Sequence, residues 1–148
     1  MERREFIKQS CLACMSGGLV SVALSGCSST YYTAGAVEVN GLFIAKSEFT
    51  FLKKDKPQTR QYLIVQNDKL AFPIYVYRFS ENEYSALWMQ CSHQGNELQA
   101  LGDQLHCPAH GSEFDNRGKV NQGPASYPLR SFPVDVSGDK IFIDLRAK

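Results

Sequence analysis

The fold of this 148-residue chain depends on two short stretches, Cys91-Ser92-His93-Gln94-Gly95 and Cys107-Pro108-Ala109-His110-Gly111-Ser112. Each stretch begins with a thiol, reaches an imidazole two or three residues later and then a glycine. Thiolates and imidazoles are common metal ligands in proteins. The surrounding interval, residues 91–125, is rich in Gly, Pro, Asn and Gln and poor in bulky apolar residues. Such a loop-rich segment needs something to hold it, so the sequence predicts a metal centre here.

The two stretches follow the patterns C-x-H-x-G and C-P-x-H-G-S, and together they resemble the Rieske iron–sulfur family. The resemblance covers roughly Leu87 to Val136 and includes three further motifs: Phe114-Asp115, Gly118-Lys119-Val120 and Gly123-Pro124-Ala125. It implies a Rieske-type [2Fe–2S] cluster, with an inner iron bound by Cys91 and Cys107 and an outer, solvent-facing iron bound by His93 and His110. Two thiolates leave the oxidised cluster uncharged, whereas four leave it anionic. The potential is therefore about −150 to +300 mV, against about −400 mV for plant-type clusters.

Residues beside the ligands are expected to support the cluster. Gly95 and Gly111 can adopt backbone conformations that other residues resist, and they allow amides to approach the sulfides. Pro108 fixes the chain between two ligands, and Gly123-Pro124 matches the family's loop over the cluster. Ser112 matches the position whose hydroxyl hydrogen-bonds a cluster sulfide, which favours the more negative reduced state.

Two departures distinguish the chain from respiratory members of the family. Those proteins place an extra cysteine in each ligand loop, and the pair forms a disulfide; the corresponding positions here are Asn96 and Ala109, which implies a disulfide-free type. Phe114 also stands where the respiratory type has a tyrosine that donates a second hydrogen bond. We expect a midpoint potential below respiratory values, kept above the lowest ferredoxin-like members by Ser112.

A Cys2His2 zinc site is the main alternative for the four ligands, because its ligand set is chemically the same. Zinc motifs more often use C-x-x-C and H-x-x-x-H pairs, and zinc does not explain the Gly-Ser after the last ligand. The sequence therefore favours iron and sulfide. The third histidine, His106, ends a short strand-like run beside Cys107, and strand alternation directs it away from that ligand. We expect His106 to be a surface or packing residue.

The remainder of the chain predicts an all-β fold. Short runs rich in β-branched and aromatic residues occur without a helical period over three turns. The predicted strands are 37–39, 42–45, 49–52, 61–66, 74–79, 84–90, 104–106, 132–136 and 140–145. Asn40-Gly41 and Ser137-Gly138-Asp139 predict hairpin turns. We expect a Rieske domain at 37–148, a small antiparallel sandwich or barrel of the Rieske type, with a loop-rich cluster-binding subdomain at about 88–126.

Residues 1–26 have the features of an export signal. The segment Arg3-Arg4-Glu5-Phe6-Ile7-Lys8 resembles a twin-arginine motif, and Leu24-Ser25-Gly26-Cys27 resembles a lipobox. The apolar stretch between them is short and diluted by Gly and Ser, whereas a spanning helix needs about 20 mostly apolar residues. Arg3 and Arg4 are then export determinants, Cys27 is the lipidation site, and residues 27–36 form a tether. An ordinary N-terminal helix of the domain is the alternative.

These features predict a one-electron carrier that is lipid-anchored outside the cytoplasm of a bacterium, on the periplasmic or outer face of a membrane. The expected partner is a cytochrome or a larger oxidoreductase subunit, and quinol is a candidate electron donor. The balance of 16 basic and 15 acidic residues gives no bulk signal for nucleic acid. A complete oxygenase would need a second iron held by two histidines and a carboxylate, for which the chain has too few histidines. The alternatives are a Rieske subunit of a quinol-oxidising cytochrome bc-like complex and a zinc-stabilised binding module without redox activity.

Overall fold

Three strands that are buried on both faces form the centre of the molecule in the computed structural model, which describes residues 30–146. They are β6 (Tyr62–Val65), β7 (Ile74–Arg78) and β8 (Tyr84–Trp88), paired antiparallel in sequence order. Successive side chains of a strand point to opposite faces. One face of these strands contributes Tyr62, Ile64, Tyr75, Tyr77 and Leu87 to one hydrophobic core, and the other contributes Leu63, Val65, Ile74, Val76 and Ala86 to a second core. Burial on both faces explains why these runs are almost continuously apolar.

The central sheet has five strands in the order β1-β6-β7-β8-β13. Its outer strands are β1 (Tyr32–Thr33), which is parallel to β6, and β13 (Ser131–Phe132), which is antiparallel to β8. The second core lies between this sheet and a four-stranded sheet made of β14 (Val134–Ser137), β15 (Lys140–Asp144), β3 (Gly41–Ala45) and β2 (Ala36–Val37). A 3-10 turn, η1 (Lys46–Phe49), leads into a separate two-stranded hairpin of β4 (Thr50–Lys53) and β5 (Lys56–Thr59).

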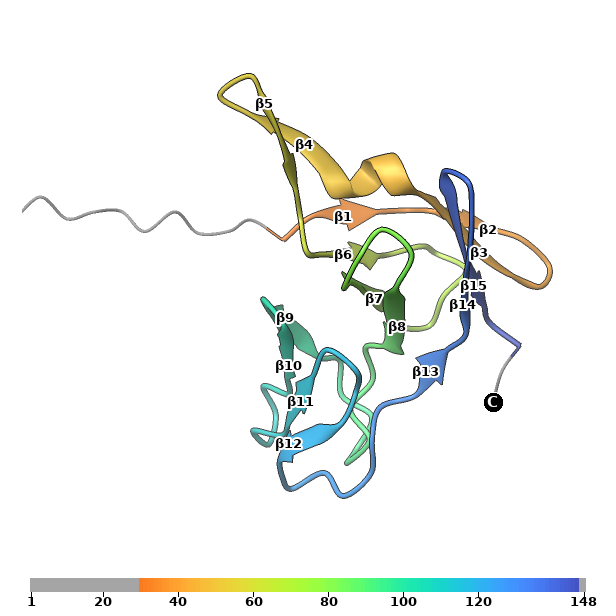
Figure 1. Ribbon diagram of the computed structural model, residues 1–148. Helices are drawn as coiled ribbons and strands as arrows, with labels where there is room; N and C mark the ends of the chain where they lie inside the picture. Colours follow the sequence, from red (N-terminus) through yellow and green to blue (C-terminus); the bar gives the residue numbers. More distant parts are fainter. Residues whose placement is uncertain (1–29, 147–148) are drawn as a thin grey trace, which may run out of the picture.

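A small subdomain is inserted between β8 and β13 and occupies the lower part of Figure 1. Its antiparallel sheet has the order β12 (Val120–Gln122), β11 (Glu113–Asp115), β10 (Gln104–His106) and β9 (Gln99–Leu101). Leu98, Leu105 and Phe114 from this subdomain pack in the same core as the tyrosine-bearing face of the central sheet. The hydroxyl of Tyr75 also donates a hydrogen bond of 2.8 Å to the carbonyl of Gly102 in the β9–β10 turn. The subdomain is thus packed onto the central sheet.

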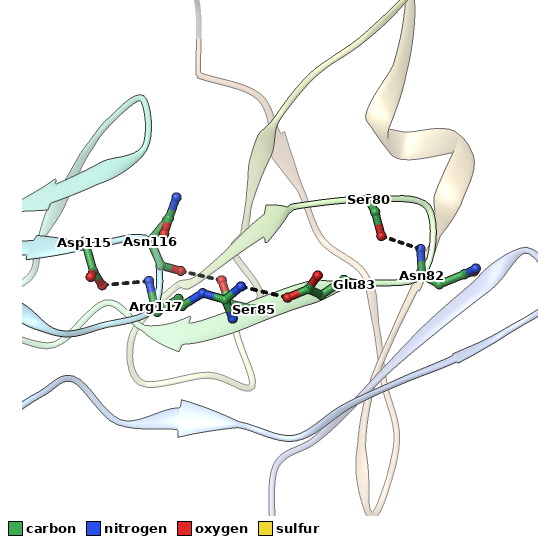
Figure 2. Close-up of polar contacts among 7 residues, drawn as sticks. All are labelled: Ser80, Asn82, Glu83, Ser85, Asp115, Asn116 and Arg117. Atoms are coloured by element: carbon green, nitrogen blue, oxygen red, sulfur yellow. Dashed lines mark hydrogen bonds and ion pairs between the residues drawn. The ribbon is translucent and has the colours of Figure 1, made fainter.

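The turn between β11 and β12 adds a polar connection to β8 (Figure 2). The hydroxyl of Ser85 donates to the carbonyl of Asn116 at 2.5 Å, and the guanidinium of Arg117 lies 2.7 Å from a carboxylate oxygen of Glu83. Within the turn, the Asp115 carboxylate accepts a hydrogen bond from the backbone N–H of Arg117 at 2.8 Å. The turn is therefore fixed internally and attached to the central sheet at two points.

The all-β, mainly antiparallel fold predicted from the sequence is confirmed, and most predicted strands fall within a residue or two of observed ones. The predicted strand 132–136 was wrong in one respect, because Pro133 separates β13 from β14. Among the described residues, strand pairing begins at Tyr32, so β1 lies within 27–36, the stretch that the sequence assigned to the tether. The loop-rich interval contains four short strands, β9 to β12, of which only β10 was predicted.

The expected export residues Arg3, Arg4 and Cys27 lie outside the described residues. Within 30–146, no helix has the length and apolar character needed to cross a bilayer.

Candidate metal centre

Cys91 and Cys107 lie inside the core that joins the small subdomain to the central sheet. Their side chains are 3% and 0% exposed, and both belong to the cluster of buried residues that includes Leu105 and Phe114. Neither forms a disulfide. Both thiols are therefore available as ligands on the interior side of the site.

The two loops that carry the cysteines share one backbone pattern. In the first loop, the N–H of Cys91 donates to the carbonyl of Asn96, and the N–H of Gly95 donates back to the carbonyl of Cys91, both at 2.8 Å. Residues 107–112 repeat this arrangement at 2.8 and 2.9 Å. Each loop thus closes on its own cysteine, which fixes the position of the thiol.

Both loops require a left-handed backbone at the glycine that follows the histidine. Gly95 has a φ of +76° and Gly111 a φ of +79°. Residues with a Cβ rarely adopt this conformation, so the expected conformational role of both glycines is supported. A Cβ at Gly95 would also lie 3.1 Å from the side-chain amide nitrogen of Gln90, whereas Gly111 has open space around it.

His93 and His110 lie on the solvent side of the same two loops. Both side chains are exposed, and their ring centroids are 5.1 Å apart with the ring planes at 90°. The imidazoles therefore form a neighbouring pair at the surface, while both thiols lie in the core. His106 does not join them: it is half-buried on β10, with Nδ1 3.8 Å from Oε1 of Glu113 on the adjacent strand.

Ser112 is the buried polar side chain of the site, with 0% exposure. Its hydroxyl oxygen accepts a hydrogen bond of 3.0 Å from the backbone N–H of Ala125. A hydroxyl has one proton to donate and two lone pairs. Since the hydrogen bond from Ala125 uses one of the lone pairs, the hydroxyl proton of Ser112 is available to an acceptor in the site.

The segment 122–127 is attached to both ligand loops. Besides the Ala125–Ser112 contact, the hydroxyl of Ser92 donates to the carbonyl of Tyr127 at 2.6 Å, and the side-chain amide of Gln122 donates to the carbonyl of Gly111 at 3.3 Å. The segment contains Gly123-Pro124, which the sequence placed over the cluster. These contacts hold it beside the site.

A model of the Rieske [2Fe-2S] domain family matches residues 45–133. The chain belongs to the Rieske family. The matched range contains both ligand loops, the central strands β6 to β8 and the small subdomain. A Rieske-type [2Fe–2S] cluster is accordingly its cofactor, and the family favours this cluster over the zinc alternative.

Curated relatives of this Rieske protein are iron–sulfur subunits of cytochrome b6-f complexes. The "Cytochrome b6-f complex iron-sulfur subunit 2" of Nostoc sp. (strain PCC 7120) is 40% identical over 55 residues, which cover 36% of this chain and 31% of that protein. The corresponding subunit of Prochlorococcus marinus (strain MIT 9211) is 49% identical over 55 residues, with the same coverage. The matched region thus spans about a third of the relatives' length.

Two solved structures are also similar to the chain. The plasma membrane Rieske protein PetC3 from Synechocystis PCC 6803 is 30% identical with a TM-score of 0.49, covering 57% of this chain and 86% of that one. The complex of reduced oxygenase and oxidized ferredoxin in carbazole 1,9a-dioxygenase includes a chain that is 24% identical with a TM-score of 0.50, covering 71% and 94%. The similarity to the chain from the carbazole 1,9a-dioxygenase complex is a similarity of fold alone.

The residues of this Rieske domain fit such a cluster. Two thiols face inward and two imidazoles face outward, as a centre with differently ligated irons requires. Within 30–146, no three His, Cys, Asp or Glu side chains are grouped as ligands of a single ion. Phe114, 0% exposed, contributes an apolar ring to the core that contains both cysteines.

Sequence reasoning missed three residues of the site, Ser92, Gln122 and Tyr127. Ser92 occupies a variable position of the C-x-H motif, and its partner at Tyr127 is a backbone carbonyl, which any residue supplies. Gln122 also donates to a backbone carbonyl. No pattern of residue types reveals contacts of this kind, because only the fold brings the segments together.

Proposed function

We propose that the protein carries single electrons through a Rieske-type cluster ligated by Cys91, Cys107, His93 and His110. One observation carries the proposal: two loops of the same backbone design present two buried thiols and two exposed imidazoles side by side. The site combines a buried pair of candidate ligands with a solvent-facing pair. Such an arrangement suits electron exchange with another molecule.

Each part of the site has a distinct task in this proposal. When bound, the cluster supplies reversible one-electron oxidation and reduction. Cys91 and Cys107 hold its inner side within the core and away from water. His93 and His110 present its outer side to a redox partner. The hydroxyl of Ser112, which accepts the N–H of Ala125, would donate a hydrogen bond to the bound cluster, and this contact would favour the reduced state because the cluster then carries more negative charge.

Metal analysis combined with electron paramagnetic resonance tests the ligand assignment. We expect equal amounts of iron and acid-labile sulfide in the purified full-length protein and a Rieske-type signal after reduction. His110→Ala should abolish this signal, whereas His106→Ala is a matched control that removes a nearby imidazole and should retain it. Zinc in place of iron, or loss of the signal in His106→Ala alone, would contradict the assignment.

We further propose that the carrier is of the disulfide-free type and is tethered outside the cytoplasm through an acylated Cys27. The free Cys91 and Cys107 and the residues Asn96 and Ala109 support the first part. The twin-arginine-like motif and lipobox support the second, because the twin-arginine route carries folded, cofactor-loaded proteins. Mass spectrometry of the N-terminal peptide from native membranes should show an acylated Cys27. A Cys27→Ser variant should appear in the soluble exported fraction, and unchanged membrane association would contradict a lipid tether.

A second setting is a subunit of a quinol-oxidising cytochrome bc-like complex, favoured by the names of the curated relatives. In that setting an exposed imidazole, His93 or His110, would accept a proton from the quinol, and the accompanying electron would go to the cluster. We favour a small subunit or stand-alone carrier, because Asn96, Ala109 and Phe114 replace residues typical of respiratory members. Affinity purification from native membranes discriminates the two: a b-type cytochrome in stoichiometric amount would support the complex and contradict the carrier.

A further inference from the structure

The hairpin of β4 and β5 extends away from the two cores. All residues of β5 are exposed, as are three of the four residues of β4. Its turn is formed by Lys54 and Asp55, both with positive φ, at 52° and 60°. In Figure 1 the hairpin points upward from the body, at the opposite end from the small subdomain with β9 to β12. The hairpin therefore contributes little to the core and is free to contact something outside the molecule.

The tip of this hairpin combines positive charge with an exposed apolar side chain. Lys53, Lys54 and Lys56 are exposed, and none has an ion-pair partner within residues 30–146. The adjacent Leu52 is 73% exposed. With Asp55 as the only acidic residue of this turn, the tip has an excess of two positive charges. Lysines beside an exposed leucine match a surface of anionic headgroups with apolar chains beneath it.

The base of the hairpin lies where the described chain begins. The Arg60 guanidinium, just after β5, stacks over the Tyr31 ring at 3.7 Å and over the Phe51 ring at 4.9 Å. Tyr31 also donates to Glu48 at 2.7 Å. Tyr31 and its neighbour Tyr32 are exposed, and tyrosine is enriched at membrane–water interfaces. Tyr31, near the start of the described residues, and the base of the hairpin are therefore fixed to each other.

Chain length places the tip within reach of a membrane that holds Cys27. Only residues 28–30 separate Cys27 from Tyr31, and four chain steps span at most about 14 Å. The strands of the hairpin have four residues each, which extend about 13 Å. The two lengths are comparable, so a chain anchored at Cys27 allows the basic tip to reach the lipid surface.

We propose that the β4–β5 hairpin docks on an anionic lipid surface, with the lysines at the headgroups and Leu52 inserted below them. The proposal rests on the tethered carrier of the preceding section and adds an orientation to it. Because the small subdomain is at the opposite end of the molecule, docking through the hairpin directs His93 and His110 away from the bilayer. The cluster would then meet partners in the aqueous space.

Vesicle binding by the full-length Cys27→Ser chain tests the charged part of the proposal without dependence on acylation. The probes are vesicles of phosphatidylglycerol with phosphatidylcholine, and vesicles of phosphatidylcholine alone. At roughly five-fold per lysine near an anionic surface, loss of the three hairpin lysines alone corresponds to about a hundredfold, and replacing them by glutamate should therefore weaken binding to the anionic vesicles by at least that factor. The matched control reverses the charge of three exposed lysines elsewhere, and its binding to the anionic vesicles should be weakened far less. Its substitutions are Lys69→Glu, Lys119→Glu and Lys140→Glu. Equal losses in both triple variants, or equal binding to both vesicle types, would overturn the proposal.

Fluorescence quenching by brominated lipids tests the insertion of Leu52. Leu52→Trp should be quenched on anionic vesicles, whereas Leu101→Trp, at an exposed site on β9 of the small subdomain, should not. Quenching of Leu101→Trp alone would place the other end at the membrane and refute the orientation. Binding to an acidic protein without any vesicle binding would also refute it. Cluster absorbance recorded on the same samples reports folding, so failure of docking is distinguishable from failure of the redox assignment.

Discussion

Replacing Ser112 by alanine separates two tasks that the structure assigns to one hydroxyl. The oxygen accepts the N–H of Ala125 at 3.0 Å, and the proton is left for the cluster. In Ser112→Ala the N–H of Ala125, a residue only 5% exposed, loses its acceptor. A buried unsatisfied donor costs about 1–3 kcal/mol, so the variant should lose its cluster at a lower temperature than the wild type.

The same substitution should lower the midpoint potential. A hydrogen bond to a charged acceptor is roughly twice as strong as one to a neutral acceptor, so loss of the donor destabilises the reduced cluster by about 1–2 kcal/mol more than the oxidised one. Since 59 mV corresponds to a factor of ten in a one-electron couple, the potential should fall by about 40–90 mV. Protein-film voltammetry measures this shift directly.

Ser92→Ala is the matched control for this experiment. Ser92 also joins a ligand loop to segment 122–127, but it does so by donating its proton to the carbonyl of Tyr127 at 2.6 Å. Its proton is therefore already used, and the variant should retain the wild-type potential. An unchanged potential in Ser112→Ala, or an equal fall in Ser92→Ala, would refute the assigned hydrogen bond.

Three further predictions concern the core around the cysteines. Phe114→Tyr adds a phenol donor to this core and should raise the potential in voltammetry; a fall would mean that the ring does not face the cluster. Tyr75→Phe removes the hydrogen bond to the carbonyl of Gly102 and should lower the free energy of unfolding by about 1 kcal/mol. Burial raises the pKa of Tyr75 above its usual value of 10, so its contribution to stability is complete below pH 10 and is lost as the pH rises above 10. Denaturation at increasing pH should therefore show a shallower alkaline decline for Tyr75→Phe than for the wild type or for Tyr127→Phe, at an exposed site. Removal of iron should increase amide hydrogen exchange in the ligand loops and β9–β12 while β3 and β15 stay protected; uniform exchange would contradict two separate cores.

The pattern of the four proposed ligands and the central strands could both be predicted from the sequence, for physical reasons. Metal chemistry restricts Cys91, His93, Cys107 and His110 to few residue types at tight spacing, so the pattern survives without knowledge of the fold. Strands β6 to β8 are buried on both faces, and this demands long apolar and β-branched runs that are visible in a linear sequence.

Short and exposed elements were not accessible in the same way. The residues of β5 are all exposed, so no alternation of polar and apolar side chains marks the strand. β1 has two residues, and its pairing with Ile64 and Val65 depends on the complete sheet. The segment 122–127 is attached through backbone carbonyls and one N–H, groups that every sequence contains. These features follow from tertiary contacts.

The two cores explain how one small domain can hold its ligands rigidly and still leave an end free for docking. Cys91 and Cys107 share their core with the tyrosine-bearing face of β6–β8, and the turn at residues 115–117 is attached to Ser85 of β8 and to Glu83, which directly precedes that strand. Ligands fixed in this way need little rearrangement when the charge of the site changes, which is the condition for preorganised electrostatics. The hairpin of β4 and β5 belongs to neither core and lies at the other end of the molecule. Changes at its tip should therefore alter where the protein is held without altering the potential of its cluster.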